Sequence, residues 1–157
     1  MTGHSAQRGA VPVGYVCELG PVETGAILYL RLWFDGPDAQ SQVWQDFSSS
    51  LGQQRGRLVM ESFEVLCDLC VRYARRPMMR HHVTCKCVGA DESCFANFVG
   101  YASEGAREDA LLMAVNMVRP DVAVSLVDLA AAFGLALKCM AGRLSDDSGR
   151  AMPTTIH

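Results

Sequence analysis

The chemistry-bearing residues of this chain gather in its middle, where five of the seven cysteines and two histidines fall between positions 67 and 94. Cys67 and Cys70 are three residues apart, a spacing that places both side chains on one face of a helix. Zinc takes four thiolate or imidazole ligands in a tetrahedron, often supplied as two closely spaced pairs. The sequence therefore predicts a site for zinc or another soft metal, with the ligands Cys67, Cys70, Cys85 and Cys87. The ligands held in reserve are Cys94, His81 and His82.

Two other interpretations of the same cysteines stay open. Free cysteine is among the most buried residue types, so Cys67 and Cys70 could simply fill the core, as we expect for Cys17 and Cys139. Alternatively, the cluster is a thiol redox sensor. Cys94 lies where a helix N-terminus would stabilise a thiolate, and the Cys85-Lys86-Cys87 segment could oxidise to a disulfide.

The cysteine count also bears on the compartment. An odd number cannot pair fully within one chain, and disulfides rarely persist in a reducing cytosol. The first fourteen residues lack the charged lead and apolar run of a secretory signal. No run approaches the roughly 18 apolar residues of a membrane span. We therefore expect a small cytoplasmic protein that does not enter a membrane.

Positive charge is concentrated next to the cysteines. The net charge is -3, yet the segment from Arg55 to Ala90 carries seven Lys/Arg against three Asp/Glu. Such asymmetry can mark a binding surface, although it is more often a solvated face. A protein partner is the expectation, and nucleic acid is the weaker alternative because the overall charge is negative. The residues predicted to bind the partner are Arg72, Arg75, Arg76 and Arg80.

Catalytic motifs do not stand out. The chain has no G-x-S-x-G, no H-E-x-x-H and no phosphate-binding glycine loop. A cysteine nucleophile with His81 or His82 as its base would need a third group to orient the histidine, and the sequence identifies none. The sequence thus favours a regulatory or interaction protein over an enzyme, and a helical interaction module without a metal remains the simplest alternative.

Hydrophobic periodicity predicts the elements that must position these residues. The clearest helix spans 57–76, with a broad apolar stripe and Pro77 after its last turn. The apolar run 26–34 fits a strand or a helix, and its helical neighbours favour a helix. Asp91 is the expected N-cap of the helix after the connector. We predict an all-α, single-domain bundle of about six helices over residues 15–144, with a Cys/His-rich connector and flexible tails at 1–14 and 145–157.

The last predicted helix, 122–142, permits a second interpretation. Its alanine, glycine and apolar residues over 126–144 have a spacing that resembles the helix-turn-helix of bacterial repressors. That resemblance implies a turn at 135–137 and DNA binding through Lys138 and Arg143. A single helix accounts for the same residues, with Gly134 as a point of close packing.

Overall fold

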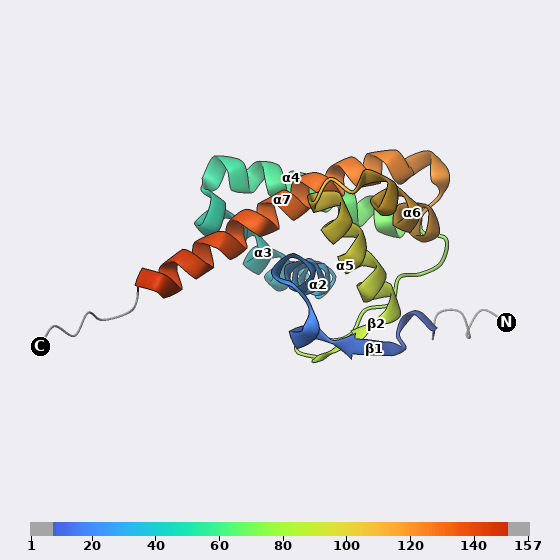
Figure 1. Ribbon diagram of the computed structural model, residues 1–157, viewed down its shortest axis with the longest axis horizontal. Helices are drawn as coiled ribbons and strands as arrows, with labels where there is room; N and C mark the ends of the chain where they lie inside the picture. Colours follow the sequence, from blue (N-terminus) through green and yellow to red (C-terminus); the bar gives the residue numbers. More distant parts are fainter. Residues whose placement is uncertain (1–7, 151–157) are drawn as a thin grey trace, which may run out of the picture.

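The computed structural model describes residues 8–150, with side chains through residue 147, and confirms the predicted all-α bundle (Figure 1). The described chain forms six α-helices and one two-stranded sheet. The strands are β1 (Pro12–Tyr15) and β2 (Cys87–Gly89), and a short 3-10 helix, η1 (Val16–Glu18), follows β1. The helices are α2 (Pro21–Trp33), α3 (Pro37–Leu51), α4 (Gln53–Arg72), α5 (Ala90–Ser103), α6 (Arg107–Met117) and α7 (Pro120–Arg150).

The ambiguous run 26–34 is helical. Pro21 starts α2 at a position where its missing N–H needs no partner. Ala26 and Leu30 are then fully buried on the inner face of the helix, four residues apart. Arg31, one residue further on, is also buried, with only 4% of its surface exposed. A cation in that position requires partners, and they form the site described below.

Aromatic rings join the helices into one core. Phe47 of α3, Phe63 of α4 and Phe133 of α7 are fully buried. The Phe63 and Phe133 ring centroids are 4.6 Å apart, and Phe47 contacts both rings. Such contacts contribute about 0.5–1.5 kcal/mol per pair beyond the burial of area. The core therefore forms where α3, α4 and α7 meet.

Helix α4 is offset from its predicted range of 57–76. It begins at Gln53 and ends at Arg72, before the last two arginines of that range. The cause is a tertiary contact: Ala74 forms an isolated antiparallel bridge with Val118. The Arg75 N–H donates to the Met117 carbonyl, and the Arg119 N–H donates to the Tyr73 carbonyl. Backbone groups that would continue the helix are used by the α6–α7 junction instead.

Helix α7 is continuous, so the turn at 135–137 that the resemblance to a helix-turn-helix implies does not form. The single-helix interpretation is confirmed, because Leu126, Ala130 and Phe133 form one buried stripe. Gly134 is a close-packing point: a Cβ there would lie 2.5 Å from the Ser103 Cβ of α5. Figure 1 shows α7 crossing the whole bundle.

The boundaries of the domain also differ from those predicted. Helix α7 extends to Arg150, into the range expected as a tail, and β1 begins at Pro12, within the expected N-terminal tail. Among the described residues, α7 is the one helix long and apolar enough to cross a membrane by length and composition. Part of that apolar composition is the stripe, including Leu126, Ala130 and Phe133, that is buried in the bundle.

Two glycines of α7 provide a matched test of this packing. Gly134→Ala should lower the free energy of unfolding by about 1–3 kcal/mol, because its Cβ would overlap Ser103 and approach the Val99 carbonyl within 3.0 Å. Gly142→Ala should be neutral or stabilise by up to about 1 kcal/mol, since no neighbour lies within 4 Å and alanine favours a helix. Chemical denaturation measures both, and equal effects would contradict close packing at Gly134.

Candidate functional site

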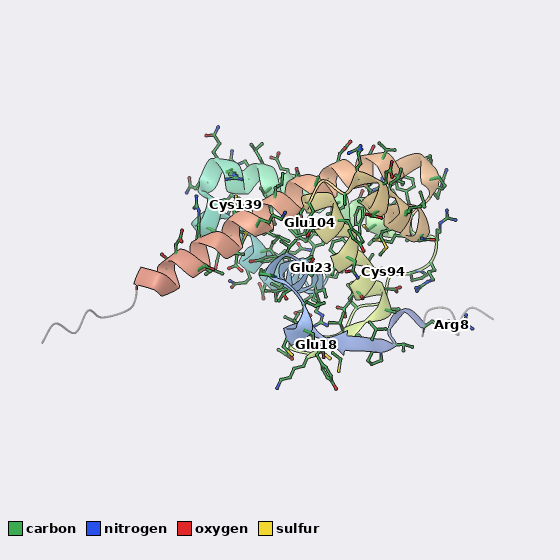
Figure 2. All side chains as sticks on the ribbon, viewed as in Figure 1. Arg8, Glu18, Glu23, Cys94, Glu104 and Cys139 are labelled. Carbon is green, nitrogen blue, oxygen red and sulfur yellow. The ribbon has the colours of Figure 1, made fainter. Side chains whose placement is uncertain are left out.

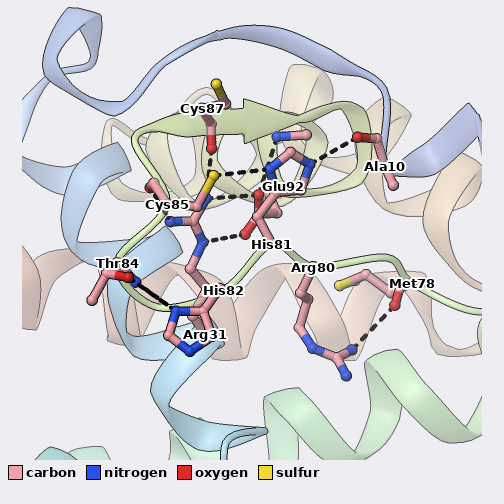
Figure 3. Close-up of polar contacts among 11 residues, drawn as sticks. Ala10, Arg31, Met78, Arg80, His81, His82, Thr84, Cys85, Cys87 and Glu92 are labelled. Carbon is pink, nitrogen blue, oxygen red and sulfur yellow. Dashed lines mark hydrogen bonds and ion pairs between the residues drawn. The ribbon is translucent and has the colours of Figure 1, made fainter.

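The connector between α4 and α5 is held in place by a buried ion pair. Arg31 of α2 donates from Nε and Nη2 to both carboxylate oxygens of Glu92, at 2.5 and 2.9 Å. Its two terminal nitrogens also donate to the carbonyls of Cys85 and Cys87, at 2.7 and 2.8 Å. Glu92, in the first turn of α5, is fully buried. One guanidinium thus joins α2, the connector and α5 (Figure 3).

Glu92 is held as a carboxylate. Burial acts to raise its pKa, but hydrogen bonds from Arg31 and from the Gly89 N–H outweigh burial and bring the pKa below its ordinary value of 4.5. A lowered folded-state pKa stabilises the fold above the ordinary value, and this stability is lost as the pH falls through the folded pKa. The sequence predicted no functional role for Glu92, and its buried pair with Arg31 is a finding of the structure.

The fixed connector brings a thiol and an imidazole together. The Cys85 Sγ lies 3.4 Å from His81 Nδ1, and His81 Nε2 lies 2.7 Å from the Ala10 carbonyl (Figure 3). A carbonyl only accepts, so Nε2 carries a hydrogen and the neutral ring presents a bare Nδ1 to the thiol. Ala10, just before β1, is therefore the orienting group that the sequence did not reveal. Its long separation from His81 left no local signal.

The surroundings favour charge separation within this pair. Hydrogen bonding between the thiol and the His81 ring, and next the Cys87 N–H, lower the pKa of the Cys85 thiol. The Ala10 carbonyl, and next Cys85, raise the pKa of His81. The two shifts bring the pKa values toward each other and favour the pair of a thiolate and a protonated ring.

Cys17 faces the same region, although it is 68 residues from Cys85 in the sequence. Strand β1 pairs antiparallel with β2, with Tyr15 opposite Cys87. The Val16 N–H then donates to the Lys86 carbonyl at 2.8 Å, which continues that register beyond the strands. The next residue, Cys17, lies in η1, where the chain turns out of the ladder. We expected Cys17 to fill the core, and this is wrong, because its side chain is exposed.

Cys17 and Cys85 line a cleft of about 660 Å³ between η1, α2 and the connector. Its walls are mostly apolar and include Leu19, Ile27, Leu28 and Val83. Ligand-binding sites typically have volumes of about 300–1,000 Å³ and apolar walls with few polar groups. The cleft therefore has the size and character of a small-molecule site, with the thiol at its wall.

The other predicted metal ligands lie elsewhere. Cys67 and Cys70 are buried in the α4 core, where burial raises the pKa of both thiols, that of Cys70 to about 12. Neutral thiols are poor ligands for zinc. Within residues 8–150, no three His, Cys, Asp or Glu side chains are grouped so that they could hold a metal ion. The structure therefore separates the two cysteine pairs of the predicted site.

Cys94 does not have the environment predicted for it. It lies in α5, but burial, and next the charge of Asp91, raise the pKa of its thiol. Asp91 is not the N-cap, which is Gly89. Instead, the Asp91 carboxylate pairs with Arg76 and accepts the Met79 N–H at 2.7 Å. Figure 2 shows Cys94 on α5 and Cys139 on α7, both away from η1.

The four arginines predicted to bind a partner make contacts within the chain. Arg72 pairs with Asp68, and Arg76 pairs with Asp91. Arg75 Nε donates to the Val115 carbonyl at 2.6 Å. Arg80 lies over the Phe34 ring, 4.0 Å from its centroid. All four arginines thus have partners within the chain, and partner binding by this surface stays a prediction.

Comparison with known proteins adds no family to this description. No protein-family model, curated protein or solved structure matches the chain.

The buried ion pair gives a direct test of the site's framework. Arg31→Met should lower the free energy of unfolding by about 3–5 kcal/mol, because it leaves the Glu92 carboxylate buried without its cation. Arg107→Met is the matched control: it breaks an exposed pair with Asp128 and should cost at most about 1 kcal/mol. Urea denaturation compares the two, and similar losses would contradict a special role for Arg31.

Proposed function

We propose that this chain is a small regulatory protein that senses oxidants through Cys85. The observation that carries the proposal is the contact between the Cys85 Sγ and His81 Nδ1, with His81 oriented by the Ala10 carbonyl. This arrangement supplies a nucleophile, a base and an orienting group, the three parts that an activated thiol needs. Its chemistry is two-electron oxidation of sulfur, which is reversible at the sulfenic acid and disulfide stages.

Cys17 is the proposed disulfide partner of Cys85. Both side chains line one cleft, and a backbone hydrogen bond joins their chain neighbours Val16 and Lys86, which favours a disulfide between the two thiols. A Cys17–Cys85 bond would tie η1 to the connector at the rim of the cleft. Because Arg31 binds the carbonyls of Cys85 and Cys87, a change in the connector would also reach α2 and α5. Oxidation could thus alter the surface offered to a protein partner.

The proposed redox function also bears on the compartment of the protein and on metal binding. A sensor of this kind works in a reducing compartment such as the cytoplasm, where its thiols start reduced. Zinc binding by Cys67, Cys70, Cys85 and Cys87 stays a prediction that the metal content of the purified protein checks. The burial of Cys67 and Cys70 favours the thiol chemistry of Cys85 over a four-cysteine site.

Alkylation against pH tests the activated thiol. Iodoacetamide should modify Cys85 several-fold faster at pH 7 than any of the other six cysteines, and its rate should rise with an apparent pKa below the ordinary 9.0. In His81→Gln the apparent pKa should move back up. His82→Gln is the matched control, because the His82 ring bonds to the hydroxyl and the backbone N–H of Thr84. Peptide mapping by mass spectrometry gives the site, and identical profiles in all three proteins would refute activation by His81.

Disulfide mapping tests the partner thiol. Diamide treatment of the reduced protein, followed by non-reducing peptide mapping, should yield a Cys17–Cys85 bond as the first product. Cys139→Ser should leave that product unchanged, since Cys139 contacts Arg55 away from the cleft. Cys17→Ser should abolish it. A Cys85–Cys87 bond as the first product, or no bond to Cys85, would contradict the pairing.

A further inference from the structure

The cleft beside Cys85 has a composition that selects among oxidants. Leu19, Ile27, Leu28 and Val83 give it an apolar lining, and Ile27 is almost fully buried. Arg31 also lines it, but every nitrogen of its guanidinium is already bonded to Glu92 or to connector carbonyls. Tyr15, Thr24 and Lys86 add a few polar groups to a mostly apolar lining, so the cleft favours a molecule with a carbon skeleton over a small polar one such as hydrogen peroxide.

The position of the two thiols indicates what the bound molecule does. Cys85 and Cys17 line the same cleft, and a backbone hydrogen bond from Val16 to Lys86 joins the residues next to them. A thiolate with a second thiol in reach is suited to an oxidant, because only oxidation closes a disulfide. An apolar oxidant with a weak bond open to attack by sulfur is an organic hydroperoxide.

We propose that the cleft binds an organic hydroperoxide and presents its peroxide bond to Cys85. This inference rests on the redox function proposed above and names its substrate class. The Cys85 thiolate attacks the terminal peroxide oxygen, the O–O bond breaks, and the alkoxide leaves. The alkoxide takes the proton that His81 received from the thiol and departs as an alcohol. Cys85 becomes a sulfenic acid, and the peroxide is reduced by two electrons.

The second step uses Cys17. Its sulfur attacks the sulfenic sulfur of Cys85, the S–O bond breaks, and water leaves with the Cys17 proton. The product is the Cys17–Cys85 disulfide, so one hydroperoxide yields one alcohol, one water and one disulfide. Both thiol protons and all oxygen atoms are accounted for without a further reactant.

The experiment compares two oxidants on the reduced, full-length chain. Cumene hydroperoxide and hydrogen peroxide are each mixed with the protein, and oxidation of Cys85 is followed by trapping and mass spectrometry. We expect a rate constant at least about tenfold higher for cumene hydroperoxide, because burial of its apolar group in the cleft contributes binding that hydrogen peroxide lacks. In Leu28→Gln, the ratio of the two rate constants should fall toward one.

The ratio is the informative quantity, since any change in the thiolate fraction of Cys85 affects both oxidants equally. Leu112→Gln is the matched control: this leucine is exposed on α6, away from the cleft, and its variant should keep the ratio of the parent protein. Equal rate constants for both oxidants in the parent protein, or an unchanged ratio in Leu28→Gln, would overturn the organic hydroperoxide as substrate.

Iodoacetamide and diamide separate the failure of this inference from that of the redox function. One outcome is equal rate constants for the two peroxides, together with fast alkylation of Cys85 and a diamide-induced Cys17–Cys85 bond. It would rule out the organic hydroperoxide as substrate and leave the redox function intact. Slow alkylation of Cys85 and no bond to Cys17 would overturn both.

Discussion

The buried contact between Arg31 and Glu92 is the interaction on which the rest of the site depends. Two charges without access to water are stable only when their hydrogen-bonding capacity is filled, and here every nitrogen of the guanidinium has an acceptor. Two of those acceptors are connector carbonyls. The same charge that must be satisfied inside the protein therefore fixes the backbone that carries Cys85, and the chemistry of the thiol follows from a requirement of folding.

The environments of the cysteines divide them by chemical role. Cys67 and Cys70 are surrounded by the α4 core, where burial keeps a thiol neutral and unreactive. Cys85 lies at the wall of a cleft, beside an imidazole whose far nitrogen is bound to a carbonyl. Residues of the same type thus differ in reactivity because their surroundings stabilise different protonation states. The small sheet matters for this division, since it brings Cys17 and Ala10 to the connector.

The local sequence pattern was sufficient to predict most of the fold. The apolar stripes and breakers predict the six helices, and the structure confirms a bundle of that kind. The errors occur where a distant segment competes for the backbone. Helix α4 ends early because Ala74 pairs with Val118, whereas α7 follows the single-helix interpretation, with Gly134 packed on α5. The run 26–34 contained one usable signal for the site, a single arginine among apolar residues, which requires a buried partner.

The sequence by itself determined the helical periodicity, the position of the Cys/His-rich connector and the absence of familiar catalytic motifs. Only the tertiary structure decided which cysteines share an environment. It separated Cys67 and Cys70 from Cys85, and it joined Cys85 to His81, to the Ala10 carbonyl and to Cys17. The physical reason is range: helix formation is governed by neighbours three and four residues apart, whereas the protonation and pairing of a thiol depend on groups that the fold brings from about 70 positions away.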